Sequence, residues 1–342
     1  MTEKSYGGNN GVREHLGKTI KGKLSKTNKI RSKSNSVTTP TVSSDSNSET
    51  DDYIKAGKIA IKVRDYAKEI IKKDMLLLDI AKKIEDKIYE LGGVPAFPVN
   101  LSIDDVAAHY HPTLEDQTKA TGLLKVDLGI HINGCIADTA FSMDLTEDKR
   151  YSGLIKASEE ALTNALELLL SKPNSALNNI GEEIQKTIEK KGFSPIINLS
   201  GHGLSDYKIH SGITIPNYAN GNLHTLEPGA YAIEPFATTG EGKVFDGPSS
   251  NIYAIVNVKT PRGPTARKIL ELVGEKYKTL PFSLREMQEK LGNMARLGLR
   301  ELEQLGIAHN FPQLIEKSHK PVSQAEHTII KTKDGKIIIT TR

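Results

Sequence analysis

The chain has 342 residues, of which 37% are hydrophobic and 26% are charged, a composition typical of a soluble globular protein of one or two domains. No apolar run approaches the roughly 20 residues that span a membrane, so we exclude a membrane-spanning helix and expect a cytoplasmic protein. A single cysteine, Cys135, excludes an intramolecular disulfide and a cysteine-rich zinc site.

The first 52 residues differ from the rest. Residues 1–34 contain nine Lys and Arg but only two Glu, so their positive charge exceeds the net +4 of the whole chain, and residues 35–52 are rich in Ser and Thr. Such a segment cannot bury enough apolar surface to offset its ordering entropy, and we predict that residues 1–52 form a disordered arm. The basic part suits contact with RNA phosphates or a ribosome surface; a solubilising tail without a specific partner is the alternative.

Two helices are expected after the arm. Apolar residues recur at three-to-four spacing from Ile54 to about Lys73, and a second such pattern runs from Leu77 to Leu91 and stops at two glycines. An extended stretch from Pro95 to Ile103 follows.

The next segment predicts a β-hairpin, because Asn133-Gly134 stands between two runs of β-forming residues. A two-residue turn places Asp127 opposite Ala140 and Asp138 opposite Gly129. The two aspartates are then diagonal neighbours on one face, with Cβ atoms about 7–8 Å apart. The other face is expected to be core: Val126, Leu128, Ile130, Ile132, Cys135, Ala137, Phe141 and Met143.

The remaining elements alternate between helix and strand patterns. Helices are predicted near Tyr151 to Leu170 and Ala176 to Lys191, and strands at Ile196 to Leu199, Gly229 to Ala237 and Asn251 to Val258. Residues 262–317 have a helical pattern without clear strands, and Asp334-Gly335 predicts a second hairpin. This order indicates an α+β fold rather than a parallel βαβ sheet.

Several polar residues stand where strands normally carry apolar ones. Asp127 and Asp138 share one face; Glu234 is flanked by apolar residues, Glu326 directly precedes a β-branched strand, and His202 lies between two glycines. A solvated surface hairpin is the alternative for the aspartates, since burying both without a cation is costly. Together, four carboxylates and an imidazole suit two divalent Mn, Fe, Co or Zn ions about 3.5–4 Å apart. Such ions activate water, so hydrolysis is the expected reaction.

The segments VDLGIHINGCIADTA, NLSGHGL, KIHSG, AIEPFAT and QAEHTI resemble the methionine aminopeptidases, metallopeptidases of the pita-bread (creatinase/aminopeptidase) fold. The resemblance covers residues 53–342. It implies removal of the initiator methionine from peptides and nascent proteins, a preference for a small second residue, and two divalent ions (Co, Mn, Fe or Zn) as cofactors. We expect a monomer without membrane contact.

The resemblance also implies roles for individual residues. The ligands of the two metal ions would be Asp127, Asp138, His202, Glu234 and Glu326, of which Asp138 and Glu326 would bridge both ions. Catalysis would fall to His109 beside the scissile amide, His210 at the substrate carbonyl, and Glu234 as proton shuttle. Phe97, Pro98 and Asn100 fall where the family builds its methionine pocket. His111 stands where the family usually has Thr, which leaves open the shape of the loop beside His109.

The spacing between the last two ligands indicates the subtype. Glu234 and Glu326 are 92 residues apart, and the excess coincides with residues 262–317. This resembles the inserted helical, winged-helix-like subdomain of the type II enzymes, of which the archaeal form is the nearer match. The expected domains are therefore a pita-bread catalytic domain over 53–261 and 318–342, and a helical insertion over 262–317.

Two other functions remain as alternatives. An Xaa-Pro peptidase shares this fold and ligand order but normally carries an additional N-terminal domain, whereas about 75 folded residues precede Asp127 here. A non-catalytic relative that binds ribosomes or RNA would have lost ligands, and this chain has all five together with both histidines.

Overall fold

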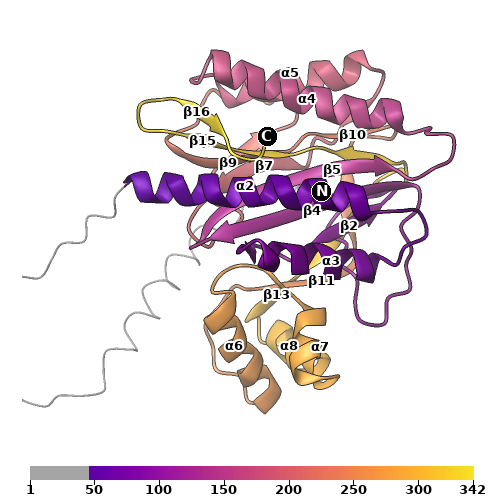
Figure 1. Cartoon of the computed structure of the whole chain (residues 1–342), viewed down its shortest axis with the longest axis vertical. Coiled ribbons are helices and arrows are strands. Elements are labelled where there is room, and N and C mark those ends of the chain that lie inside the picture. The colour runs from indigo at the N-terminus through magenta and orange to yellow at the C-terminus, as the bar shows by residue number, and fades with distance from the viewer. Residues whose placement is uncertain (1–45) are drawn as a thin grey trace, which may run out of the picture.

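A computed structural model describes residues 46–342 and shows helices packed on antiparallel sheets (Figure 1). The predicted arm over 1–45, including its basic part, lies outside the described residues. Its last residues, 46–52, belong to the first helix, so the predicted boundary is wrong there. Glu49 and Asp52 in the first turns favour a helix N-terminus, and Tyr53 is buried in the core.

Helices α2 (Ser46–Ile70) and α3 (Leu77–Glu90) cover one sheet. The buried side of α2 is lined by small residues at three-to-four spacing, which let the helix lie close to β4 (Leu123–Ile132) and β5 (Cys135–Asp144): Ala56, Ala60, Val63 and Ala67. Figure 1 shows α2 lying along this hairpin. The two predicted helices are confirmed, the first of them with an earlier start.

The hairpin β4–β5 has the predicted register, with Ile132 opposite Cys135 and Asp127 opposite Ala140. Two short strands, β1 (Val94–Pro95) and β2 (Asn100–Ile103), pair with the other edge of β4. The apolar face is buried as expected except at Ile132 and Met143, which are partly buried. The polar face is covered too, since the Ser142 hydroxyl donates to the Gln324 carbonyl. The alternative of a solvated surface hairpin is therefore wrong.

The second half of the chain repeats a feature of the first. Helices α4 (Ser152–Ser171) and α5 (Leu177–Lys190) pack on a second sheet, and α5 begins 100 residues after α3. Gly92 and Gly192 follow α3 and α5 with the same φ of 81°, and the strands β1 and β6 (Ser194–Pro195) come next. Each of these turns leads the chain from a helix into a stretch that carries predicted site residues.

The second sheet has the order β16-β15-β9-β7-β8. Its strands are β7 (Ser200–Leu204), β8 (Thr214–Pro216), β9 (Gly229–Ile233), β15 (His327–Lys331) and β16 (Ile337–Ile339). The predicted strand at 196–199 is wrong, because these residues connect β6 to β7. The predicted strand at 229–237 is split at Pro235, which has no N–H for a ladder, into β9 and β10 (Phe236–Thr238). The hairpin at Asp334-Gly335 is confirmed.

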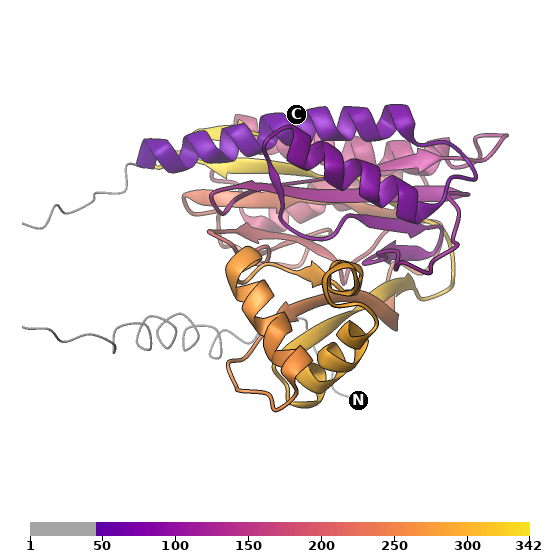
Figure 2. The same cartoon turned by 60° about the horizontal axis from the view of Figure 1, so that its bottom comes forward.

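Three helices form a separate cluster beside the sheets, as Figures 1 and 2 show: α6 (Pro264–Lys276), α7 (Leu284–Leu291) and α8 (Met294–Gln304). The prediction of a strand-free stretch over 262–317 is wrong for β12 (Phe282–Ser283) and β13 (Ala308–Glu316). β13 pairs with β11 (Val244–Ile255) and β3 (Val106–Ala108), so partners distant in sequence make it a strand. β11 also begins earlier than predicted. Its register shifts between Asp246 and Ser249 and again before Tyr253, and such bulges interrupt the apolar–polar alternation by which a strand is recognised in a sequence.

All strand pairs formed within residues 46–342 are antiparallel, which agrees with the predicted α+β class. The short strand β14 (Val322–Gln324) pairs with β10 and leads directly to Glu326. Over the same residues, the helices are all too short or too polar to cross a membrane.

Candidate metal centre

The hairpin brings the two aspartates to the middle of the molecule. Asp138 is 3% exposed and stands opposite Gly129, where an added Cβ would lie 2.2 Å from the Phe97 ring. Phe97 therefore packs over the strand beside Asp138. On the other side of β5, the Glu326 N–H donates to the Ala140 carbonyl at 3.0 Å, which fastens Glu326 next to the aspartates.

The second sheet supplies His202 and Glu234. His202 lies on β7 opposite Ala232 of β9, and Glu234 follows β9 directly. A Cβ on Gly203 would lie 2.0 Å from the Ser211 carbonyl oxygen, so only glycine lets the loop that carries His210 fold this closely onto β7. As a result the rings of His202 and His210 meet edge to face, with centroids 4.4 Å apart.

Side-chain atoms from the five predicted ligand residues converge on one place. One ligand atom each from Asp138, His202 and Glu326 lie within 4.8 Å of one another. His202 Nε2 is 3.8 Å from Asp138 Oδ2 and 3.5 Å from Glu234 Oε1. Asp127 lies close enough for its charge to act on the others: after burial, its repulsion is the next largest cause of the raised pKa values of Asp138 and Glu234.

Within the part of the chain that the structure describes, no cationic side chain balances the charges of this carboxylate cluster. Burial is the largest cause of a pKa raised to about 7 for Asp127 and well above the ordinary range for Asp138, Glu234 and Glu326; mutual repulsion adds to it for the last three. Burial also lowers the pKa of His202 to about 4, so its ring is neutral and offers a lone pair. Over residues 46–342 the cluster has no ion pair with Lys or Arg.

Among the described residues, three carboxylate oxygens of the cluster are buried without a hydrogen-bond partner: Asp127 Oδ1, Asp138 Oδ1 and Glu326 Oε2. Buried polar atoms are normally satisfied, and buried anions normally have a countercharge. Oxygen and imidazole donors of this kind, with no thiolate, fit divalent transition-metal ions. The site is therefore chemically complementary to a cationic ligand.

The two predicted catalytic histidines are placed differently. His210 is exposed and contacts His202. His109 contacts β13: its Nδ1 lies 3.1 Å from the Pro312 carbonyl oxygen, and its ring meets the edge of Phe311. Its backbone has a φ of +65°, which is unusual for a residue with a Cβ.

The predicted pocket residues border the aspartates. Asn100 is paired with Asp127 across β2 and β4, and its Nδ2 donates to the Pro98 carbonyl at 2.9 Å. Its Oδ1 is buried and has no partner. Phe97 covers Gly129, as described above, and Pro98 adjoins it in the chain. These three residues thus lie beside the hairpin that carries Asp127 and Asp138.

Two residues that contact the aspartates were not predicted from the sequence. Gln324 Nε2 lies 3.4 Å from Asp127 Oδ2, and the Thr328 hydroxyl both donates to the Asp138 carbonyl and accepts from the Asp138 N–H, each at 2.8 Å. Both lie two residues from Glu326, so the alternation of side chains along a strand could have identified them.

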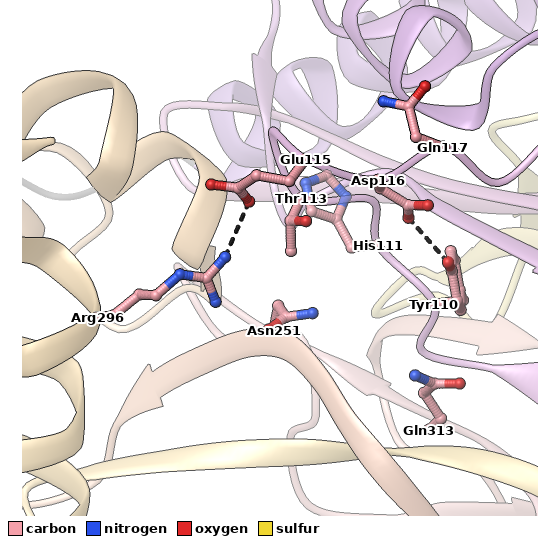
Figure 3. A pocket seen from close by; sticks show the side chains of 9 residues that line it. All are labelled: Tyr110, His111, Thr113, Glu115, Asp116, Gln117, Asn251, Arg296 and Gln313. Atoms are coloured by element: carbon pink, nitrogen blue, oxygen red, sulfur yellow. Dashed lines mark hydrogen bonds and ion pairs between the residues drawn. The ribbon is translucent and has the colours of Figure 1, made fainter. Parts of the chain in front are cut away.

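A cavity of about 470 Å³ lies between the loop after His109 and the helical cluster (Figure 3). It is lined by Tyr110, His111, Thr113, Glu115, Asp116, Gln117, Asn251, Arg296 and Gln313. None of the five predicted ligands lines it, so this cavity is distinct from the carboxylate cluster.

Comparison with known proteins identifies the family. Residues 51–259 match the family described as metallopeptidase family M24. The chain belongs to this family. It is 44% identical over 295 residues to the methionine aminopeptidase of Pyrococcus horikoshii, an alignment that covers 85% of this chain and 99% of that protein. The predicted resemblance is confirmed.

Solved structures share the fold at much lower identity. A thermophilic Arx1 superposes with a TM-score of 0.72 at 19% identity, over 86% of this chain and 91% of that one. The prolidase of Pyrococcus furiosus gives 0.52 at 17% identity, over 87% of this chain and 64% of that one. The predicted pita-bread fold is thus confirmed, and sequence identity rather than fold separates the activities.

Proposed function

We propose that this chain removes the N-terminal methionine from peptides and nascent proteins, with two divalent ions held by Asp127, Asp138, His202, Glu234 and Glu326. The observation that carries the proposal is the buried carboxylate cluster, which has no countercharge within residues 46–342 and contains a neutral imidazole. The 44% identity to a methionine aminopeptidase over nearly its whole length supports the same activity.

The donor set fits two ions rather than one. Four carboxylates neutralise two divalent charges, and carboxylate–imidazole sites accept Mn, Fe, Co or Zn. Asp138 and Glu326 are close enough to share a hydrogen bond when a proton is present, and this supports them as the two bridging ligands. When bound, such ions polarise a carbonyl and make water nucleophilic near neutral pH.

The chain's own residues would orient the substrate and move the protons. Glu234, at the edge of the cluster, would accept a proton from the attacking water and deliver it to the leaving amine. His210, which contacts His202 and is open to solvent, would hold the substrate carbonyl and the oxyanion that forms from it.

The hydrogen bond between His109 and Pro312 determines which ring nitrogen of His109 can accept a hydrogen bond from the substrate. The Pro312 carbonyl can only accept, so Nδ1 carries the hydrogen, and burial lowers the pKa of this ring so that it stays neutral. Nε2 therefore has a free lone pair. We assign it to the N–H of the scissile amide.

Substrate selection would depend on the residues beside the hairpin. Phe97 and Pro98 offer apolar surface for the methionine side chain, and the unpartnered Oδ1 of Asn100 offers an acceptor next to Asp127. A cramped site beyond the scissile bond would favour a small second residue.

The first test is release of free methionine by the full chain from a Met-Gly-Met-Met peptide, with Met-Leu and Xaa-Pro peptides as controls. We expect release from the first peptide only, loss of activity with a chelator, and recovery with Co or Mn. Cleavage of the Xaa-Pro peptide instead would identify a prolidase-like enzyme. No cleavage with any metal would favour a non-catalytic binding protein, for which contact of residues 1–34 with RNA or ribosomes stays a prediction.

A further inference from the structure

The backbone at His109 is held in an unfavourable conformation. Its φ of +65° lies in the left-handed region, which residues with a Cβ adopt only where the surrounding structure imposes it. On the N-terminal side, β3 is fixed by its pairing with β13. On the C-terminal side, the residues after His109 are held by the contacts of His111 and Tyr110.

The His111 side chain, which is 2% exposed, provides one such attachment. Its Nδ1 lies 2.7 Å from the Val99 carbonyl oxygen, and its Nε2 lies 3.2 Å from Nε of Arg285. A carbonyl only accepts and a guanidinium only donates, so Nδ1 carries the hydrogen and Nε2 is the acceptor. The imidazole thus bridges two fixed groups with a single neutral tautomer.

Arg285 connects this ring to two further elements. It lies on α7 with 3% of its side chain exposed, and its guanidinium forms ion pairs with Glu85 of α3 and, at 3.4 Å, with Glu289. All three guanidinium nitrogens therefore have partners. The Glu85–Arg285–His111 cluster therefore connects three parts of the fold: α7 of the three-helix group α6–α8, helix α3, and the loop after His109.

The loop is also fastened to the strand that borders the aspartates. Val99, which accepts from His111, directly precedes β2, and the Leu101 N–H donates to the Tyr110 carbonyl at 2.7 Å. The two residues that follow His109 are thus both bound to the segment beside the candidate metal centre.

We propose that His111, held by Arg285, is a positioning residue that maintains the strained backbone of His109 and so aims His109 Nε2 at the substrate. The inference rests on the proposed function. The proposal gives the three-helix group α6–α8 a part in the reaction, because Arg285 lies on α7. Figure 3 shows a second link, the Glu115–Arg296 ion pair of 2.9 Å, which joins the same loop and three-helix group at the surface.

Two substitutions separate the two hydrogen bonds of the ring. His111→Asn can keep the donor near the Nδ1 position and loses the acceptor for Arg285; His111→Gln can keep an acceptor near the Nε2 position and loses the donor to Val99. We expect each to lower kcat for methionine release about 10- to 100-fold, because small misplacements of a reacting group have effects of this size. Metal content should stay unchanged. Arg296→Met, which breaks only the surface link, should change kcat less than about twofold.

The decisive experiment repeats both His111 substitutions in a His109→Ala background. If His111 acts through His109, its substitution lowers the residual kcat by less than about twofold there, because the group it positions is already absent. Equal losses in both backgrounds, loss of bound metal, or an effect confined to KM would overturn the proposal. If the His111 variants do not fold, Arg285→Lys retains a charge for Glu85 but removes the Nε–H, and the same comparison applies.

Failure of this proposal is distinguishable from failure of the proposed function. An unmodified chain that releases no methionine with any metal contradicts the function itself. An active unmodified chain whose His111 and Arg285 variants fall equally in both backgrounds contradicts only the positioning role.

Discussion

Two of the buried clusters of charged side chains within residues 46–342 differ in how their charges are balanced. In the Glu85–Arg285–His111 cluster the two charged groups form an ion pair, although burial still raises the pKa of Glu85 to about 7, and the imidazole has a partner at both nitrogens. In the carboxylate cluster of Asp127, Asp138, Glu234 and Glu326, groups of like charge repel one another, and three oxygens have no hydrogen-bond partner within residues 46–342. The burial is similar, so the difference lies in what the fold leaves for a ligand to supply.

The histidines of the two clusters illustrate the same difference. Burial lowers the pKa of both His202 and His111 to about 4, so both rings are neutral at physiological pH. The Nε2 of His111 is occupied by Arg285, whereas the Nε2 of His202 faces carboxylates that can offer it no hydrogen when they are ionised. One ring thus fastens parts of the fold, and the other presents a lone pair to a cation.

The largest effect is expected from removing a proposed bridging ligand. Asp138→Ala or Glu326→Ala should lower methionine release about 1,000-fold or more, because several kcal/mol of charge stabilisation are lost with the metal. Metal content after dialysis, measured by elemental analysis together with activity, checks this. Full metal occupancy and full activity in Asp138→Ala would contradict the ligand assignment.

Breaking the Glu85–Arg285–His111 cluster should lower the stability of the fold rather than the binding of metal. Arg285→Met leaves the Glu85 carboxylate without its cation, and we expect a loss of about 3–5 kcal/mol in the free energy of unfolding. Urea unfolding followed by circular dichroism measures it. Addition of Glu85→Gln should restore much of the loss; if it does not, the charge pairing is not what the substitution removed.

In the metal-free protein, removing a carboxylate from the carboxylate cluster should increase the free energy of unfolding, whereas Arg285→Met decreases it. The pKa of Asp127 is raised to about 7, so between pH 4 and 7 the folded protein holds a proton that the unfolded chain has released. Stability from this group is complete below pH 4 and is lost as the pH rises. Metal-free Asp127→Asn should therefore gain in unfolding free energy relative to the unmodified chain, by about 1.4 kcal/mol per pH unit over this range.

Comparing the two proteins at each pH cancels the contributions of shared groups whose pKa values Asp127 does not shift, such as His202. The substitution also removes the repulsion that Asp127 exerts on Asp138, Glu234 and Glu326, but burial keeps the pKa values of these three groups raised in both proteins. A difference that is constant from pH 4 to pH 7, or that favours the unmodified chain at pH 7 without metal, would show that Asp127 is not held protonated. With saturating metal, the sign should reverse.

The smallest effect is expected at Thr328, whose hydroxyl is hydrogen-bonded to the backbone N–H and carbonyl of Asp138. Thr328→Val preserves the shape but removes two hydrogen bonds, and metal affinity should fall about tenfold, the lower end for groups that orient ligands. Competition with a chelator measures the affinity. Thr332→Val, whose hydroxyl bonds only within its own turn, is the matched control and should leave affinity unchanged.

Local patterns in the sequence were enough for much of the fold. Asn133-Gly134 predicted the hairpin and its register, and therefore the common face of Asp127 and Asp138, because a two-residue turn leaves one pairing. The apolar spacing predicted the helices to within a few residues, except at the start of α2. The motifs that resemble the family indicated the five residues that we propose as metal ligands, and the structure places ligand atoms of three of them within 4.8 Å of one another.

The tertiary structure decided what depends on partners distant in the chain. β13 has no clear strand pattern and becomes a strand because β11 and β3 lie beside it. The polar hairpin face is covered by β14 and by the segment that carries Glu326, and within residues 46–342 this packing leaves the carboxylates without a countercharge. His111 meets Arg285 across 174 residues. Sequence thus determined which groups are present and their local geometry, while packing decided which of them remain unpaired.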